Sequence, residues 1–310
     1  MKIKPLIITL GDPNSIGPEI VINALRTKPH SKFLLVGSRD SLLKLGAEEY
    51  LDFLVEVGPV DFKVEWGKEC KEAGVVAYEA LKKSVDLIRQ GVGSAILNAP
   101  VSKKAIELSV PGFVGHTGFY ENLLGDGNEA IMSFFGQKFS LALFTHHIPL
   151  ADVSKYVLDA DLQSWLKRCF KLFEKQIKKN IKMSVLGLNP HAGEQGLLSH
   201  GEDEKIAEAV SNLRQSGYAI DGPLSADTFF QNRNLLGDRH CLVVSMQHDQ
   251  GLIPFKMAHF GNGVATTLGL SCARFTVDHG TAFDLAGKGL ADSSSMIHSL
   301  KLALQSLDEV

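Results

Sequence analysis

Three histidines could together hold a divalent metal ion, because each closely follows a hydrophobic segment typical of a buried strand: His147, His191 and His248. The segments span residues 139–144, 183–188 and 241–246. In open α/β sheets, ligands bind just beyond the carboxyl ends of the strands. Three imidazoles at that edge suit a catalytic metal, whose fourth position stays open. For each histidine taken alone, the alternative is an ordinary polar or surface role.

A second group of residues could bind an anion. His116 and Thr117 follow a glycine and precede a helical pattern, and the free N–H groups at the start of a helix suit an anionic oxygen. An N-cap role explains Thr117 equally well. Lys256 and Arg274 lie in a stretch otherwise rich in glycine and apolar residues, where cations could hold phosphate or carboxylate. Solvated side chains are the alternative for both.

Short apolar segments alternate with longer amphipathic ones along the whole chain, which predicts strands followed by helices. The expected strands span residues 5–10, 33–36, 94–97, 139–144, 183–188 and 241–246. The expected helices begin at residue 17 and cover about 70–90, 161–177, 203–215 and 292–306. This alternation implies an α/β fold with mostly parallel sheets and helices on both faces. The segment 261–289 is rich in small residues and carries no predicted element.

The composition limits the class of protein. The 310 residues suggest two domains, at roughly 150 residues per domain. The net charge of −3 argues against a protein that grips the phosphate backbone of nucleic acid. The four cysteines form no CxxC pair, which fits a reducing compartment. Because no apolar stretch is long enough for a secretory signal or a membrane span, we expect a soluble, cytoplasmic protein that contacts no membrane.

Seven motifs occur in the order found in one enzyme family. They lie at residues 11–19, 115–117, 147–150, 187–194, 222–227, 248–251 and 276–287. Through them the chain resembles the 4-hydroxythreonine-4-phosphate dehydrogenase family of pyridoxal phosphate (vitamin B6) biosynthesis over nearly its whole length. The resemblance implies oxidation and decarboxylation of 4-phosphooxy-L-threonine to 3-amino-2-oxopropyl phosphate. It also implies NAD (or NADP) and a divalent metal ion (Zn, Co or Mg) as cofactors.

The same resemblance implies an isocitrate/isopropylmalate-dehydrogenase-like fold. Such a fold has two α/β/α domains with mostly parallel sheets around a cleft that holds the active site. Residues 1–115 with 275–310 would form the terminal domain, and residues 116–274 the central domain. The implied partners are a small phosphorylated substrate and a second copy of the chain, in a homodimer whose active sites are shared between the subunits.

The resemblance assigns site residues by their position in the motifs. The metal ligands match His147, His191 and His248. The substrate-binding positions around the phosphate match His116, Thr117, Lys256 and Arg274. The loop that binds NAD without a Rossmann motif matches residues 278–284, with the cofactor-binding residues His279, Gly280 and Asp284. The candidates for acid–base chemistry, or for support of the metal ligands, are Asp227, Asp249 and Lys256.

Four positions depart from the family pattern: Ala99, Gly118, Gln247 and Ala265. Ala265 stands where the family usually has an asparagine, and losing an amide at a substrate position bears on the substrate more than on the reaction. One alternative is therefore a related dehydrogenase that acts on threonate or erythronate 4-phosphate, or on an aromatic cis-dihydrodiol. Another is a catalytically silent metal- or phosphate-binding protein, against which the intact set of metal and phosphate residues weighs.

Overall fold

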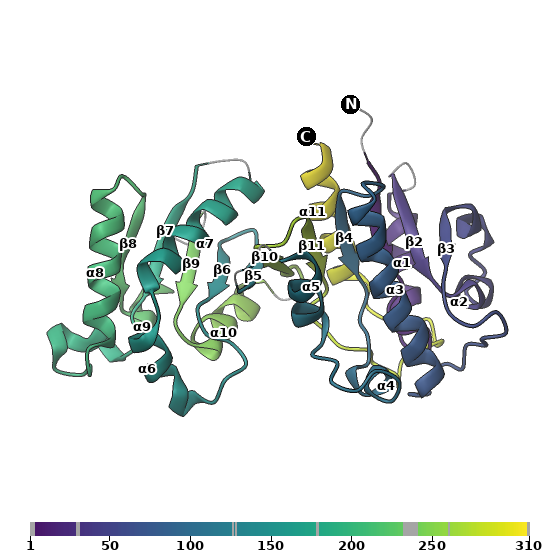
Figure 1. The fold of residues 1–310 in the computed structure, drawn as a ribbon, viewed down its shortest axis with the longest axis horizontal. Helices are drawn as coiled ribbons and strands as arrows, with labels where there is room; N and C mark the ends of the chain where they lie inside the picture. Colours follow the sequence, from purple (N-terminus) through teal and green to yellow (C-terminus); the bar gives the residue numbers. More distant parts are fainter. Residues whose placement is uncertain are drawn as a thin grey trace. The chain divides into compact units, whose positions relative to one another are not determined.

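The computed structural model describes residues 4–28, 32–125, 127, 129–177, 180–231, 241–259 and 261–308. The chain forms two compact units (Figure 1). The first combines the residues up to Ala130 with those from Val264 onward, and the second spans Ile131–Gly263. The purple N-terminal strands and the yellow C-terminal helix in Figure 1 therefore belong to the same unit.

The sheet of the first unit is mostly parallel, with the strand order β3-β2-β1-β4-β11-β10. Its strands are β1 (Leu6–Thr9), β2 (Phe33–Gly37), β3 (Leu54–Glu56), β4 (Ala95–Asn98), β10 (Val264–Leu268) and β11 (Ala273–Thr276). Neighbours pair in parallel, except β10 with β11. The helices are α1 (Gly17–Arg26), α2 (Arg39–Lys44), α3 (Lys71–Arg89), α4 (Lys103–Glu107), α5 (His116–Leu124) and α11 (Ser294–Asp308), with the 3₁₀ helix η1 (Glu48–Phe53).

A core of the first unit forms where α3 packs on β1 and β2. Apolar side chains recur at helical spacing along α3 and are buried on one face, among them Ala77 and Leu81. They share one buried cluster with Ile7 of β1 and Ile96 of β4. The helix thereby holds the neighbouring strands β1 and β4 in place, and each of these strands ends in a polar residue.

The second unit has the strand order β5-β6-β9-β7-β8. Its strands are β5 (Ile131–Phe135), β6 (Ser140–Leu143), β7 (Lys182–Leu186), β8 (Ile220–Leu224) and β9 (Cys241–Ser245). All described pairs are parallel except β5 with β6. The helices are α6 (Leu150–Asp159), α7 (Leu162–Ile177), α8 (Glu202–Gln215), α9 (Ala226–Phe229) and α10 (His248–Ala258), with the 3₁₀ helix η2 (Pro190–Gly196).

The mostly parallel α/β architecture expected from the sequence is confirmed, and every expected strand and helix forms within a few residues of its expected bounds. The segment 261–289 differs from expectation, because it contains β10 and β11. Buried polar side chains, including Thr266, Thr267 and Arg274, interrupt the apolar pattern of these strands. The pattern therefore does not stand out in the sequence.

The domain division expected from the sequence stays a prediction. In the compact units, α5 and β10 group with the terminal segments of the chain. Among the described residues, none of the helices combines the length and the apolar character that crossing a membrane requires.

Asp12 lies in the turn after β1 and is fully buried. Its Oδ1 accepts a hydrogen bond from the backbone N–H of Asn14 at 2.9 Å, whereas Oδ2 has no hydrogen-bond partner among the described residues. Burial raises the pKa of the Asp12 carboxyl to about 6, although the bond from Asn14 opposes this shift. The charge of Glu69 raises it further.

We expect the contribution of Asp12 to the free energy of unfolding to fall as the pH rises from 3.8 to about 6, because the folded state keeps a proton that the unfolded chain releases. The loss reaches at most about 3 kcal/mol and levels off at higher pH. In Asp12→Asn this part of the pH dependence should disappear. Urea denaturation of both proteins at a series of pH values measures it. Parallel pH profiles for variant and wild type would show that Asp12 ionises normally.

Candidate functional site

Two turns of the second unit bring histidines to one place. Strands β6 and β9 are parallel neighbours, with Leu143 paired to Ser245, so the turns that follow them leave the sheet at the same edge. These turns enclose a hollow of about 270 Å³. Its polar lining consists of Thr145, His146, His147, Gln247, His248 and Asp249. Two of the three histidines singled out in the sequence therefore share one hollow.

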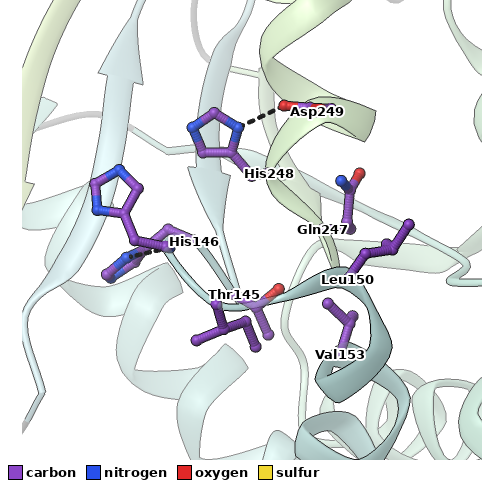
Figure 2. Close-up of a pocket in the computed structure, with 9 residues that line it drawn as sticks. Thr145, His146, Leu150, Val153, Gln247, His248 and Asp249 are labelled. Carbon is purple, nitrogen blue, oxygen red and sulfur yellow. Dashed lines mark hydrogen bonds and ion pairs between the residues drawn. The ribbon is translucent and has the colours of Figure 1, made fainter.

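The rings of His147 and His248 lie close together in this hollow. The ring centres of His147 and His248 are 5.8 Å apart. Asp249 Oδ1 lies 2.7 Å from His248 Nδ1 (Figure 2), so this contact engages Nδ1 and does not involve Nε2. A third imidazole belongs to His146, whose Nδ1 accepts a hydrogen bond from the backbone N–H of His147 at 2.9 Å.

His191 lies in η2, which follows β7, and its side chain is exposed and does not line the hollow. Five consecutive residues, from His191 to Gln195, have left-handed φ angles between 43° and 77°. Left-handed backbone costs a residue with a Cβ atom about 1–2 kcal/mol. Within the described ranges of one chain, no group of three His, Cys, Asp or Glu side chains is placed to hold a metal ion.

Two acidic residues at the start of α8 hold the loop that carries His191. Asp203 Oδ1 accepts a hydrogen bond from the backbone N–H of Leu188 at 2.8 Å. Its Oδ2 accepts from the side-chain amide of Asn189 at 2.7 Å and from the Asn189 backbone N–H at 3.2 Å. Because these bonds fix the chain immediately before His191, they offset part of the cost of the left-handed turn.

Glu202 holds the other end of this loop and is buried. Its carboxylate accepts hydrogen bonds from the Ser154 hydroxyl, from the Ser199 hydroxyl at 3.1 Å and from the backbone N–H of His200 at 2.7 Å. Burial alone would raise the pKa of Glu202, but the hydrogen bonds outweigh it and lower the pKa to about 2. Glu202 is therefore ionised at neutral pH.

The two remaining acid–base candidates are exposed. Asp227 in α9 accepts a hydrogen bond from the Ser225 hydroxyl at 2.6 Å. This bond is the main cause that lowers the pKa of Asp227, and the electrostatic effect of His191 contributes. The structure thus places Asp227 near His191. Lys256 lies on α10 and does not line the hollow.

The first unit contains a buried cation. Arg274 of β11 is 2% exposed. Its Nε donates to Asn98 Oδ1 at 2.9 Å and its Nη1 to Thr267 Oγ1 at 2.8 Å, and its guanidinium carbon lies 5.2 Å from the centre of the Tyr120 ring. No ion pair joins Arg274 to a carboxylate among the described residues. Burial lowers the pKa of Arg274 to about 10, so it stays charged at neutral pH.

His116 begins α5 in the same unit as Arg274. Its Nε2 is buried without a hydrogen-bond partner in the part of the chain that the structure describes. Burial, followed by the charges of Arg274 and Lys103, holds the pKa of His116 well below its usual range, so the ring is neutral at neutral pH. Thr117 is the next residue of α5 and is half-buried. Lys256, assigned to the same group of phosphate residues, belongs to the second unit.

The loop after β11 carries the expected cofactor residues His279, Gly280 and Asp284. His279 Nδ1 lies 3.0 Å from the carbonyl oxygen of Gly280, whereas Nε2 is buried with no hydrogen-bond partner among the described residues. Gly280 and Asp284 are exposed. The backbone N–H of Ile16 donates to the carbonyl of Thr281 at 3.2 Å, which ties this loop to the turn after β1.

Four residues around these groups were not singled out in the sequence: Asn98, Lys103, Tyr120 and His146. A signal was present for Asn98, because it is a polar residue at the end of a fully buried strand. Tyr120 and Lys103 carry no such signal, since their role depends on which strands become neighbours.

The sequence profile of the family described as "Pyridoxal phosphate biosynthetic protein PdxA" matches residues 16–303. A 4-hydroxythreonine-4-phosphate dehydrogenase of Zymomonas mobilis subsp. mobilis is 35% identical, with 98% of this chain and 96% of the relative covered. A protein of Symbiobacterium thermophilum, named for D-threonate 4-phosphate dehydrogenation, is 32% identical, with 97% and 96% covered.

Solved structures show the same likeness. The crystal structure of 4-hydroxythreonine-4-phosphate dehydrogenase from Klebsiella pneumoniae superposes with a TM-score of 0.80 at 29% identity, covering 98% of this chain and 99% of that one. Isocitrate dehydrogenase from Methylococcus capsulatus, at 14% identity, gives a TM-score of 0.51 with 99% and 86% covered, a likeness of fold alone. The isocitrate-dehydrogenase-like fold expected from the sequence is thereby confirmed.

We expect Glu202→Gln to lower the free energy of unfolding by about 2–3 kcal/mol at pH 7, because the folded-state pKa of about 2 lies below the ordinary value of 4.5. This stabilisation is fully present above pH 4.5 and is lost as the pH falls toward 2, so the two proteins should converge in acid. Urea denaturation at several pH values measures the difference. Glu208→Gln, an exposed position of the same helix, is the control. A constant difference at all pH values would contradict the argument.

Proposed function

Since the chain belongs to the pyridoxal phosphate biosynthetic protein PdxA family and is an oxidoreductase, we propose that it oxidises 4-phosphooxy-L-threonine with NAD (or NADP) as the hydride acceptor. Oxidation of the C3 hydroxyl gives a β-keto acid. Loss of CO₂ from that acid gives 3-amino-2-oxopropyl phosphate for the synthesis of pyridoxal 5'-phosphate.

The buried Arg274 cation is the observation that carries the proposal. Its partners among the described residues are neutral, and the neutral His116 beside it has a buried Nε2 that could donate a hydrogen bond. A phosphate group would supply the missing negative charge and accept these bonds. Thr117 adds a hydroxyl in the first turn of α5, where N–H groups favour an anionic oxygen. We assign the phosphate end of the substrate to these residues, with Lys256 from α10.

We assign the metal to His147, His191 and His248. The donor set fits such an ion, because two of the imidazoles share the hollow and Asp249 holds His248 with Nε2 left for coordination. Three imidazoles favour zinc or another transition metal such as cobalt over magnesium. Bound there, the ion would lower the pKa of the substrate hydroxyl and stabilise negative charge on its oxygen.

The hydrogen bonds of the acid–base candidates separate their roles. Asp249 is engaged with His248 and Asp227 with Ser225. Since the pKa of Asp227 is lowered, this carboxylate is a weak base. The Lys256 side chain has neither a hydrogen bond nor an ion pair with any described residue. We therefore assign Asp249 to the orientation of His248 and Lys256 to proton transfer as well as phosphate binding.

We assign the nicotinamide cofactor to the loop of His279, Gly280 and Asp284. The support is twofold: His279 Nε2 is buried without a hydrogen-bond partner among the described residues, and no GxGxxG motif follows β1. The backbone tie between Ile16 and Thr281 would hold this loop against the turn after β1.

The alternative substrate that we propose is D-threonate 4-phosphate or a similar sugar-acid phosphate. The name of the Symbiobacterium thermophilum relative favours it. So does Ala265, which pairs with Thr276 in the β10–β11 ladder and offers no amide to a substrate. Both substrates carry a phosphate, so the argument from Arg274 holds for either.

We also propose a cytoplasmic homodimer whose active sites use residues of both subunits. In the described ranges of one chain, His191 is not grouped with His147 and His248, and a second copy could complete the ligand set. All four cysteines are free thiols, in keeping with a reducing compartment.

Purified protein should reduce NAD with 4-phosphooxy-L-threonine faster than with D-threonate 4-phosphate, erythronate 4-phosphate or a cis-dihydrodiol, as followed by NADH absorbance.

Removal of divalent ions with a chelator should abolish turnover, and added Zn²⁺ or Co²⁺ should restore it. Asp249→Asn should weaken Co²⁺ binding about 10- to 100-fold, because the orientation of His248 is lost. Asp152→Asn, an acidic position near the start of α6, is the control. Full activity of metal-free protein would overturn the metal assignment.

Chains carrying His191→Ala and His248→Ala, each inactive alone, should regain activity when mixed, if His191 acts across the subunit interface. Each heterodimer then holds one site with both lesions and one site with neither. The pair His147→Ala with His248→Ala should stay inactive, because these rings meet within one chain. If subunit exchange is confirmed by mass spectrometry and no pairwise mixture recovers, the shared site is wrong.

A further inference from the structure

We infer that Asn98 and Tyr120 are positioning residues, which use neutral groups alone to hold the Arg274 guanidinium as an uncompensated cation for an anionic group of the substrate. The inference rests on the proposed function, in which that group is a phosphate. Both residues are completely buried, and the polar groups of their side chains are engaged by protein groups rather than left for the substrate.

A directed chain of hydrogen bonds leads from Arg274 into the core. Arg274 Nε donates to Asn98 Oδ1 and Asn98 Nδ2 donates to the Tyr120 hydroxyl, both at 2.9 Å. The Tyr120 hydroxyl lies 2.8 Å from Ser84 Oγ, which itself donates to the carbonyl of Leu81 at 2.7 Å. Tyr120 is therefore the donor to Ser84, and the direction of every bond in the chain is set.

The sheet fixes Asn98 in this chain. Asn98 is the last residue of β4 and pairs with Thr9 of β1 on one side and Thr276 of β11 on the other. Its Nδ2 also donates to Thr9 Oγ1 at 2.9 Å. With both amide hydrogens engaged, the amide has one orientation, and its oxygen must face Arg274.

The partners of Arg274 orient it without cancelling its charge. The amide of Asn98 and the hydroxyl of Thr267 are neutral, and burial raises the pKa of the Tyr120 phenol, so it too stays neutral. A carboxylate in the place of any of them would form an ion pair and reduce the attraction for a ligand anion. Fixed dipoles around a charged donor give a preorganised site that needs little rearrangement on binding.

Asn98→Asp tests the effect of charge beside Arg274 separately from the effect of side-chain geometry. The substitution keeps the size and shape of the side chain and adds a negative charge beside Arg274. The hydroxyls of Thr9 and Tyr120 can both rotate to donate to the new carboxylate, so the network can stay closed. The variant should therefore fold, with Arg274 as half of a buried ion pair.

Inorganic phosphate is the probe, and isothermal titration calorimetry measures its binding to the purified protein. Asn98→Asp should weaken binding about tenfold or more, while the midpoint of thermal unfolding is unchanged or higher. Tyr120→Phe keeps the ring over Arg274 and removes the hydroxyl, and should weaken binding about three- to tenfold. Tyr78→Phe is the matched control, since the Tyr78 hydroxyl makes no hydrogen bond with the described residues and its ring packs on Phe113 and Phe119.

Steady-state kinetics give a second readout. Asn98→Asp and Tyr120→Phe should raise KM for 4-phosphooxy-L-threonine by a larger factor than they lower kcat, because they act on the phosphate end rather than on the reacting carbon. A purely structural role would lower the thermal midpoint and leave KM of the folded protein unchanged.

Arg274→Gln separates the assignment of the phosphate to Arg274 from the positioning roles of Asn98 and Tyr120. If Arg274→Gln loses phosphate binding while Asn98→Asp and Tyr120→Phe bind as the wild type does, the positioning roles are wrong and the phosphate site stands. If Arg274→Gln itself binds phosphate normally, the assignment of the phosphate to Arg274 fails, and with it that part of the proposed function. Should Asn98→Asp fail to fold, Tyr120→Phe against Tyr78→Phe decides the question.

Discussion

Parallel strand pairing is the constraint on which both groups of functional residues depend. Parallel neighbours send their carboxyl ends to one edge, so all the turns that follow them begin there. In the second unit, the register of Leu143 with Ser245 brings His147 and His248 into one hollow. A slip by one residue would turn the strand-end side chains to the opposite face of the sheet. In the first unit, the pairing of Asn98 with Thr9 and Thr276 places the side chain that accepts the hydrogen bond from Arg274.

Three buried ionisable side chains have contrasting surroundings. Glu202 is stabilised as an anion by hydroxyl and N–H donors that converge on it, and it serves to hold a loop. Arg274 is held by neutral groups, so most of its electrostatic attraction stays available to a ligand. Asp12 has too few donors for its charge, and its pKa rises instead. A buried charge that is fully compensated by its neighbours thus has a structural role. A buried charge that is not fully compensated marks a place where a ligand can bind or a proton can be exchanged.

Much of the fold could be predicted from the sequence, because the strands that end near His147, His191 and His248 are mostly apolar segments. Strands β10 and β11 could not, since buried polar side chains break their pattern. The hydrogen-bonding partners of Arg274 could not be predicted from the sequence for a different reason. Asn98 and Arg274 are 176 positions apart, and they meet only because β4 and β11 become neighbours in the sheet. Pairings of this kind depend on topology, which periodicity does not encode.

The left-handed turn from His191 to Gln195 has a consequence for how this site could be transferred between proteins. Its handedness is unfavourable for L-residues, so a free peptide of this sequence would abandon it. The conformation persists because carboxylates at the start of α8 accept hydrogen bonds from the flanking backbone N–H groups. A chimaera that exchanged the loop without α8 would acquire the histidine but not its placement. The smallest portable module is the loop together with the first turn of the helix that follows it.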